Sequence, residues 1–141
     1  MANTTIFYDY SKRLRAILAD YDWKPVERLA RDLGACWDQQ KQVFLCGNGG
    51  SASQAMHFSG ELVGKFLVDR GPLASVCLNS DITNMTAIGN DYGYEQIYRR
   101  QVEGIGRKGD VLVCFTTSGN SENLVQAVKN IKGIKVINLL G

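Results

Sequence analysis

The first third of the chain contains two stretches in which apolar residues recur three or four positions apart. They cover roughly residues 10–21 and 26–37, and Asp22–Lys24 lies between them. Pro25 falls in the first turn of the second stretch, where a helix tolerates proline because that N–H has no helical partner. The pattern predicts two amphipathic N-terminal helices separated by a short break.

From residue 42 onward, short apolar runs alternate with helical segments. A buried strand is expected at Val43–Cys46, and further strands are expected at Ala74–Leu78, Val111–Phe115 and Lys135–Leu139. Helices are expected near 52–66, 82–88, 95–104 and 122–131. Strands that alternate with helices are typical of a mostly parallel sheet with helices on both faces. The sequence therefore predicts the α/β class.

The chain stops at Gly141, directly after the last expected strand. A parallel sheet normally has both faces covered, and a helix would be expected to follow such a strand. Either another subunit covers this surface or the natural protein continues. We favour the second alternative, in which residues 1–141 are a single domain that lacks its C-terminal strand and helix.

Composition places the chain among ordinary globular proteins. It has 141 residues, of which 45% are hydrophobic and 21% charged, and this suits one soluble domain. A net charge of +2 gives no indication of a nucleic-acid or membrane surface. Residues 1–10 are polar and aromatic and do not resemble a signal peptide. We expect a cytoplasmic protein with neither nucleic acid nor membrane as a partner.

The four cysteines lack the spacing of a metal site. Cys36, Cys46, Cys77 and Cys114 form no CxxC pair, and a single histidine excludes zinc-finger spacing. Three of them lie in apolar runs, where a reduced cysteine acts as a small hydrophobic residue. We expect buried free thiols.

Two Gly/Ser-rich loops, Gly47–Ser51 and Thr116–Ser121, each connect an expected strand to an expected helix. Glycine lets the backbone approach a ligand, helix N-termini favour anions, and hydroxyls add hydrogen-bond donors. Neither loop contains GxxxxGK[ST] or GxGxxG, so nucleotide motifs are not supported. Ser121 has an alternative role as an ordinary helix cap. Two such loops in one small domain favour a phosphate site.

Three segments in this order, CGNGGSASQAMHFSGEL, IGNDYGYEQIY and TTSGNSENLVQAV, resemble a SIS (sugar isomerase) domain. Within that family the chain is most similar to the phosphoheptose isomerases. These enzymes convert sedoheptulose 7-phosphate to D-glycero-D-manno-heptose 7-phosphate for bacterial lipopolysaccharide and surface-polysaccharide biosynthesis. The resemblance implies a flavodoxin-like parallel sheet, a homotetramer and active sites at subunit interfaces.

The resemblance also implies roles for the residues that match family motifs. Substrate contacts are implied for Asn48, Gly49, Gly50, Ser51, Glu61, Asn90 and Asp91, and contacts to the substrate phosphate for Thr116, Thr117, Ser118 and Ser121. His57 and Glu61 match catalytic residues that hold one zinc ion per subunit, and the glutamate is also a proposed catalytic base. The family uses a further glutamine and histidine on a C-terminal helix, which cannot be placed in residues 1–141.

Residue spacing alone does not decide the function of the motifs outside the two loops. His57 and Glu61 share a helix face opposite the apolar residues, together with Gly60 and Gly64, which would let another chain approach closely. This favours an interface site, and the alternative is a solvated pair worth about 0.2–0.5 kcal/mol. Asn90-Asp91 by itself fits a simple turn as well as a substrate contact. Asp81 is expected to cap the following helix.

Three other functions share these motifs. A non-catalytic SIS-domain regulator that binds the replication initiator would lack the glutamate, so Glu61 favours the isomerase. An isomerase of another sugar phosphate remains open because the loops recognise phosphate and not chain length. A sugar-phosphate sensor in a transcription regulator is disfavoured because no basic helix-turn-helix precedes the domain.

Overall fold

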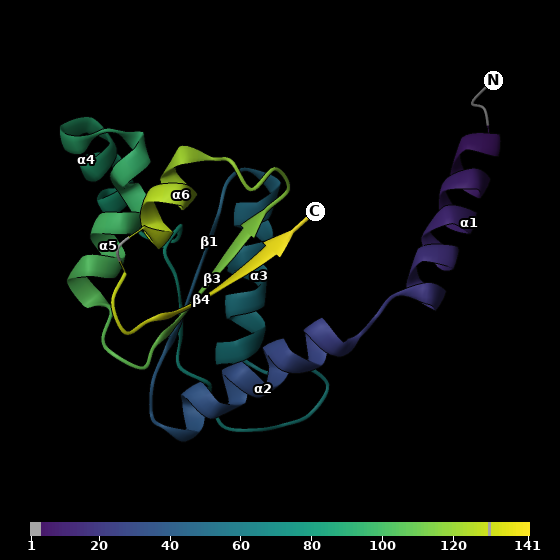
Figure 1. The fold of residues 1–141 in the computed structure, drawn as a ribbon, viewed down its shortest axis with the longest axis horizontal. Coiled ribbons are helices and arrows are strands. Elements are labelled where there is room, and N and C mark those ends of the chain that lie inside the picture. The colour runs from purple at the N-terminus through teal and green to yellow at the C-terminus, as the bar shows by residue number, and fades with distance from the viewer. Residues whose placement is uncertain (1–3, 130) are drawn as a thin grey trace. The chain divides into compact units, whose positions relative to one another are not determined.

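The computed structural model describes residues 4–129 and 131–141. The chain divides into two compact units, Met1–Arg31 and Asp32–Gly141 (Figure 1). Helix α1 spans Thr4–Asp20, and α2 spans Lys24–Asp38 and crosses the boundary between the units. Both predicted N-terminal helices are confirmed.

Helix α1 buries none of its side chains. Its apolar side chains remain exposed (Ile6, Phe7, Tyr10, Leu14, Ile17 and Leu18). In the break between α1 and α2, Asp22 Oδ1 accepts a hydrogen bond from the Lys24 N–H at 3.1 Å. An isolated helix of 17 residues is marginally stable in water.

The second unit is built on a four-stranded sheet in the order β2-β1-β3-β4, with every pair parallel. The strands are β1 (Val43–Gly47), β2 (Ser75–Cys77), β3 (Val111–Thr116) and β4 (Lys135–Leu140). The same strand order, 2-1-3-4, begins the sheet of the flavodoxin-like fold. The predicted α/β class and parallel sheet are confirmed.

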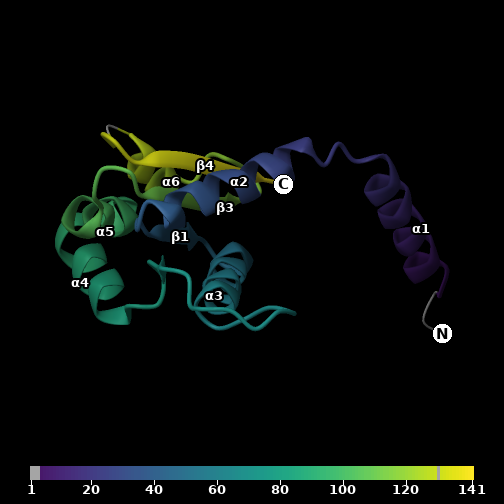
Figure 2. The ribbon, with the colours of Figure 1, turned by 90° about the horizontal axis from the view of Figure 1, so that it is seen from below.

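Helices cover both faces of the sheet, with α3 on one face and α5 and α6 on the other (Figures 1 and 2). The bounds are α3 (Gly50–Val63), α4 (Ile82–Tyr92), a 3-10 turn η1 (Tyr94–Gln96), α5 (Ile97–Ile105) and α6 (Glu122–Val128). None of the helices among residues 4–129 and 131–141 is long and apolar enough to cross a membrane.

Helix α3 ends at Val63, three residues before the expected end. Its last carbonyls accept hydrogen bonds from a side chain that lies beyond the helix. Gly64 occupies the C-cap, and the Arg70 guanidinium donates to the carbonyls of Leu62 and Glu61 at 2.9 and 2.8 Å. Phe66, which falls within the helix expected near 52–66, lies beyond the helix end and is 62% exposed.

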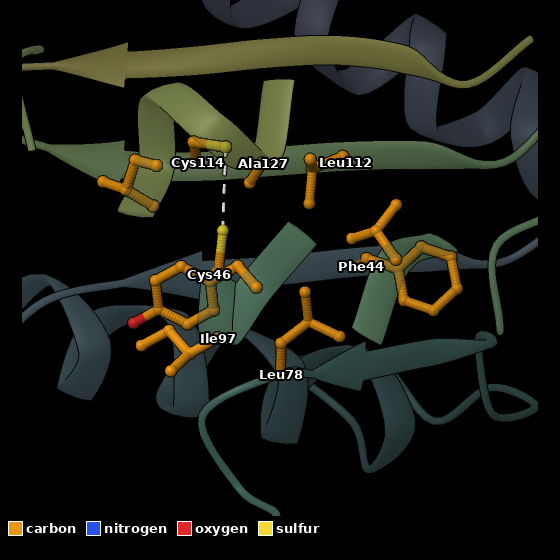
Figure 3. Packing of buried hydrophobic residues seen from close by; sticks show 10 residues of the cluster. Phe44, Cys46, Leu78, Ile97, Leu112, Cys114 and Ala127 are labelled. Atoms are coloured by element: carbon orange, nitrogen blue, oxygen red, sulfur yellow. Dashed lines mark hydrogen bonds between the residues drawn. The ribbon is translucent and has the colours of Figure 1, made fainter. Parts of the chain in front are cut away.

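The core between the sheet and α5–α6 is formed by alternate residues of β1 and β3 (Figure 3). Phe44 and Cys46 face Leu112 and Cys114 in register, and Ala127 of α6 packs on the same side. The Cys46 and Cys114 sulfurs lie 3.6 Å apart. The contact with Cys114 and burial raise the pKa of the Cys46 thiol well above its ordinary value. All four cysteines are free and buried, as predicted, and these two pack as small hydrophobic groups.

Candidate functional site

The two Gly/Ser-rich loops lie side by side because β1 and β3 are neighbours in the sheet. Each follows the carboxyl end of its strand. From β1 the chain continues into α3 on one face, and from β3 into α6 on the other (Figure 1). Such a point, where successive connections leave toward opposite faces, is where open α/β sheets bind ligands.

The first loop turns within a very small space. A Cβ on Gly47 would lie 2.7 Å from the carbonyl carbon and oxygen of Ser51, closer than packed atoms allow. Gly49 has φ +54, a conformation that favours glycine. Helix α3 begins at Gly50, at the ligand edge of the sheet, where the helix dipole favours an anion. The N–H groups of Ser51, Ala52 and Ser53 donate to the carbonyls of Asn48 and Gly49.

Gly47→Ala should lower the free energy of unfolding by about 1–3 kcal/mol, because the added methyl group forces the turn apart. Chemical denaturation followed by circular dichroism measures this loss. Gly104→Ala is the matched control, since a Cβ there meets nothing within 4 Å and alanine favours the helix. Equal stability of the two variants would contradict the close approach at Gly47.

Asn48, expected to contact substrate, uses its side chain to join the two loops. Its Nδ2 donates to Asn123 Oδ1 at 2.8 Å, and Asn123 Nδ2 donates back to Asn48 Oδ1 at 2.8 Å. Asn123 is only 3% exposed. Sequence reasoning missed Asn123, because an Asn in the first turn of a helix is ordinarily a surface residue.

A second group of side chains, Asn79 and Tyr98, also holds Gly47. Asn79 Nδ2 donates to the Gly47 carbonyl at 2.9 Å, and Asn79 Oδ1 accepts from the Gly47 N–H at 3.3 Å. The Tyr98 hydroxyl lies within hydrogen-bond distance of both the Gly47 carbonyl and Asn48 Oδ1. Burial raises the pKa of Tyr98 well above its ordinary value, so this hydroxyl remains a neutral donor.

The second loop is folded by its own hydroxyls. Thr116 Oγ1 accepts from the Gly119 N–H at 3.1 Å, and Ser118 Oγ accepts from the Asn120 N–H at 3.3 Å. Ser121 occupies the N-cap of α6, but its hydroxyl makes no capping hydrogen bond. The side-chain capping interpretation of Ser121 is therefore wrong.

His57 and Glu61 lie on the outward side of α3, as predicted. Their side chains are 79% and 32% exposed, and His57 Nε2 lies 3.5 Å from Glu61 Oε1. Two N/O ligands of one tetrahedral zinc ion, each about 2.0–2.2 Å from the metal, lie roughly 3.4 Å apart. The pair therefore fits two adjacent zinc ligands. Within the described part of the chain, no group of three or more His, Cys, Asp or Glu residues is placed to hold a metal.

An open cavity of about 510 Å³ joins α3 to the ends of β3 and β4. It is lined by Ser51, Gln54, His57, Phe58, Phe115, Thr116, Thr117, Leu139, Leu140 and Gly141. The structure thus brings residues of both loops together with His57 around a space of the size used by small-molecule sites. Sequence reasoning missed Gln54, which lies one helical turn before His57.

Asn90 and Asp91 lie apart from this cavity. They belong to the last turn of α4 and not to a loop, so the simple-turn interpretation is wrong. Asn90 Nδ2 donates to Asp91 Oδ1 at 2.8 Å, and Asp91 lines a separate cavity of about 340 Å³. Asp81 caps α4 as expected, accepting from the Asn84 N–H at 2.9 Å.

Residues 6–141 match the sequence profile of a protein family described as the SIS domain. The chain belongs to the SIS domain family. The fold and the loop positions expected from this family are those that the structure shows.

SIS-domain relatives include phosphoheptose isomerases. The chain is 52% identical over 104 residues to the phosphoheptose isomerase of a Nitratiruptor species, covering 72% of this chain and 56% of that protein. With the phosphoheptose isomerase of Bordetella avium it shares 56% identity over 88 residues, covering 62% of this chain and 45% of that protein. The chain spans about half the length of these relatives.

Two solved SIS-domain structures resemble the fold closely. A phosphoheptose isomerase from Francisella tularensis superposes with a TM-score of 0.90 at 34% identity, covering 97% of this chain and 73% of that one. The phosphoheptose isomerase of Neisseria gonorrhoeae gives a TM-score of 0.87 at 36% identity, covering 100% of this chain and 76% of that one.

Proposed function

We propose that the protein is a sugar-phosphate aldose–ketose isomerase that converts sedoheptulose 7-phosphate to D-glycero-D-manno-heptose 7-phosphate. The observation that carries the proposal is the cavity where Ser51, Thr116 and Thr117 meet His57 at the β1–β3 switch point. A phosphate held by the second loop would leave the sugar near α3. The names of the relatives support the same reaction.

The chemistry requires a base that removes a proton next to the carbonyl and returns it to the neighbouring carbon. Glu61 is the proposed base, because its partly exposed carboxylate contacts His57, which lines the cavity, and a carboxylate can exchange protons with a sugar. Hydroxyls of the second loop fix the phosphate. The binding energy of the phosphate holds the reacting carbons in place. Less translational and rotational entropy is then lost when the substrate reaches the transition state.

We propose zinc as the cofactor, one ion per subunit. His57 Nε2 and Glu61 Oε1 would supply two of its ligands, since their 3.5 Å separation fits adjacent zinc ligands. A zinc ion polarises a carbonyl oxygen as a Lewis acid. His57 thus contributes to catalysis by holding the metal, and Glu61 combines a ligand role with that of the base.

The proposed assembly is a homotetramer with active sites at subunit interfaces. The exposed apolar side chains of α1 and the outward position of His57 and Glu61 support contacts with other subunits. Asn90 and Asp91 would then contact substrate from a neighbouring subunit, since they lie apart from the cavity of their own chain. We further propose a cytoplasmic enzyme of bacterial lipopolysaccharide or surface-polysaccharide biosynthesis.

His57→Ala should abolish zinc binding, because this is the chain's only histidine and its loss removes a ligand. Atomic absorption after dialysis should give about one zinc per subunit for the unaltered protein and close to none for the variant. Ser53→Ala, on the same helix and exposed, is the control and should retain its zinc. Equal zinc content in all three proteins would exclude His57 as a ligand.

The reaction itself is tested by incubating the purified protein with sedoheptulose 7-phosphate and following the heptose 7-phosphate by NMR. Turnover is the expected result. The absence of turnover in zinc-loaded protein would overturn the proposed reaction. Faster turnover of a pentose or hexose phosphate would assign the same chemistry to another substrate.

A further inference from the structure

We propose that Asn123 and Tyr98 are positioning residues that act through Asn48 to hold the first loop in register with the second. The first loop is Gly47–Ser51, and the second is Thr116–Ser121. The inference rests on the proposed function, and it assigns a role to two side chains that do not line the 510 Å³ cavity.

The first support is the reciprocal amide pair. Asn48 and Asn123 exchange two hydrogen bonds of 2.8 Å, and Asn123 Oδ1 also accepts from the Leu124 N–H at 3.0 Å. Asn123 lies two residues after Ser121, so its orientation is fixed at the end of the second loop. The pair therefore connects the first loop to the first turn of α6, which follows the second loop, across 75 residues of sequence.

The second support is the position of Tyr98, which reaches the same loop from α5. Its hydroxyl approaches Asn48 Oδ1 at 3.1 Å and accepts from Asn79 Nδ2 at 2.8 Å. Asn79 in turn binds both the N–H and the carbonyl of Gly47. Three separate segments of the chain, which carry Asn79, Tyr98 and Asn123, thus converge on residues 47 and 48.

The consequence is that Asn48 uses its amide to bind the protein itself. Both of its polar atoms have partners in Asn123, and Oδ1 also lies near two tyrosine hydroxyls, those of Tyr98 and Tyr94. What the first loop offers a ligand is then its glycine backbone and Ser51, held at a fixed distance from the second loop. The same loop leads into α3, which carries His57 and Glu61.

Asn123→Asp tests this role because the replacement has the same shape. The carboxylate still accepts from Asn48 Nδ2 and the Leu124 N–H, but an oxygen now faces Asn48 Oδ1. We expect kcat to fall about tenfold with KM changed less than about threefold, because the reacting end is misplaced while the phosphate contacts remain. As the pH falls from about 8 to about 5.5, a protonated carboxyl can donate to Asn48, and kcat should recover.

Asn138→Asp is the matched control. Asn138 is exposed on β4 and its side chain makes no hydrogen bond among the described residues, so this variant adds the same charge outside the network. The recovery is measured as the ratio of the Asn123→Asp kcat to the Asn138→Asp kcat, and this ratio should rise as the pH falls. Tyr98→Phe is a second variant, which removes the hydroxyl while Asn79 keeps its bonds to Gly47. It should lower kcat without recovery at low pH.

Hydrogen exchange of residues 47–51, measured by mass spectrometry without substrate, separates this inference from the proposed function. Faster exchange in Asn123→Asp and Tyr98→Phe than in Asn138→Asp is expected. Unchanged exchange, or an Asn123→Asp kcat equal to that of the control at every pH, would overturn the inference. Faster exchange in a protein that shows no turnover would support the loop connection and contradict the proposed reaction alone.

Discussion

Glu61→Gln should lower kcat for sedoheptulose 7-phosphate by about 10²–10⁴-fold, the contribution typical of a general base. Glutamine keeps the size and hydrogen-bonding shape of the side chain but cannot take up the proton. The Glu61 side chain is 32% exposed and contacts His57 on the outer side of α3, so the melting temperature should change little. Steady-state kinetics on zinc-loaded protein, with zinc content measured in parallel, give the result.

Glu103→Gln provides the comparison for this variant. Glu103 forms an i,i+4 pair with Arg99 at 2.8 Å, is 55% exposed and lies on α5, outside the 510 Å³ cavity. The Glu103→Gln variant should have a kcat within about twofold of the unaltered protein, because Glu103 lies outside the cavity. Its stability should also change little, because exposed ion pairs on a helix contribute little to stability. A Glu61→Gln enzyme as active as Glu103→Gln would exclude Glu61 as the base.

Removing two hydroxyls from the second loop, as Thr117→Val with Ser121→Ala, should raise KM by about 10²–10⁴-fold. A hydrogen bond to a charged group contributes about 1.5–3 kcal/mol, and two such bonds to the phosphate would be lost. The structure gives neither hydroxyl a hydrogen bond among the described residues, and Ser121 does not cap α6, so the fold should be retained. Inorganic phosphate should act as a competitive inhibitor. In the double variant its inhibition constant should rise in parallel with the KM of the substrate.

Ser53→Ala controls for the loss of an exposed hydroxyl near the site, and we expect it to leave KM unchanged. Ser53 lies in the first turns of α3 and does not line the cavity. The assignment of the second loop to the phosphate would fail if the double variant bound inorganic phosphate as tightly as Ser53→Ala does. A fall in kcat without a rise in KM would also contradict it.

The central strands β1 and β3 were predictable because each is a short apolar run bounded by glycine or polar residues. Val111–Phe115, for example, was expected, and β3 is observed at Val111–Thr116. The end of α3 was not predictable from its own residues. It depends on Arg70, which folds back on the last carbonyls of the helix from nine residues beyond Glu61.

The candidate site was partly predictable for the same reason. The Gly/Ser loops and the His57–Glu61 spacing are local patterns. The structure places the loops where strands meet helices and the His57–Glu61 pair on the outward side of α3. The Asn48–Asn123 pair depends on β1 lying next to β3, which no local pattern specifies. Substrate contacts were implied for Asn90 and Asp91, yet they lie in the last turn of an α4 that is longer than expected, and Asp91 lines a different cavity.

The strand order also determines when the site can form during folding. β1 is a central strand, fully buried along Val43–Gly47, yet its neighbour β3 follows 68 residues later in the chain. Contacts between residues so distant in sequence form slowly, because the intervening chain must first lose its freedom. A growing polypeptide therefore carries β1 with an open, apolar edge until residues 111–116 arrive. The ligand-binding edge of the sheet acquires its geometry only when that late pairing is complete.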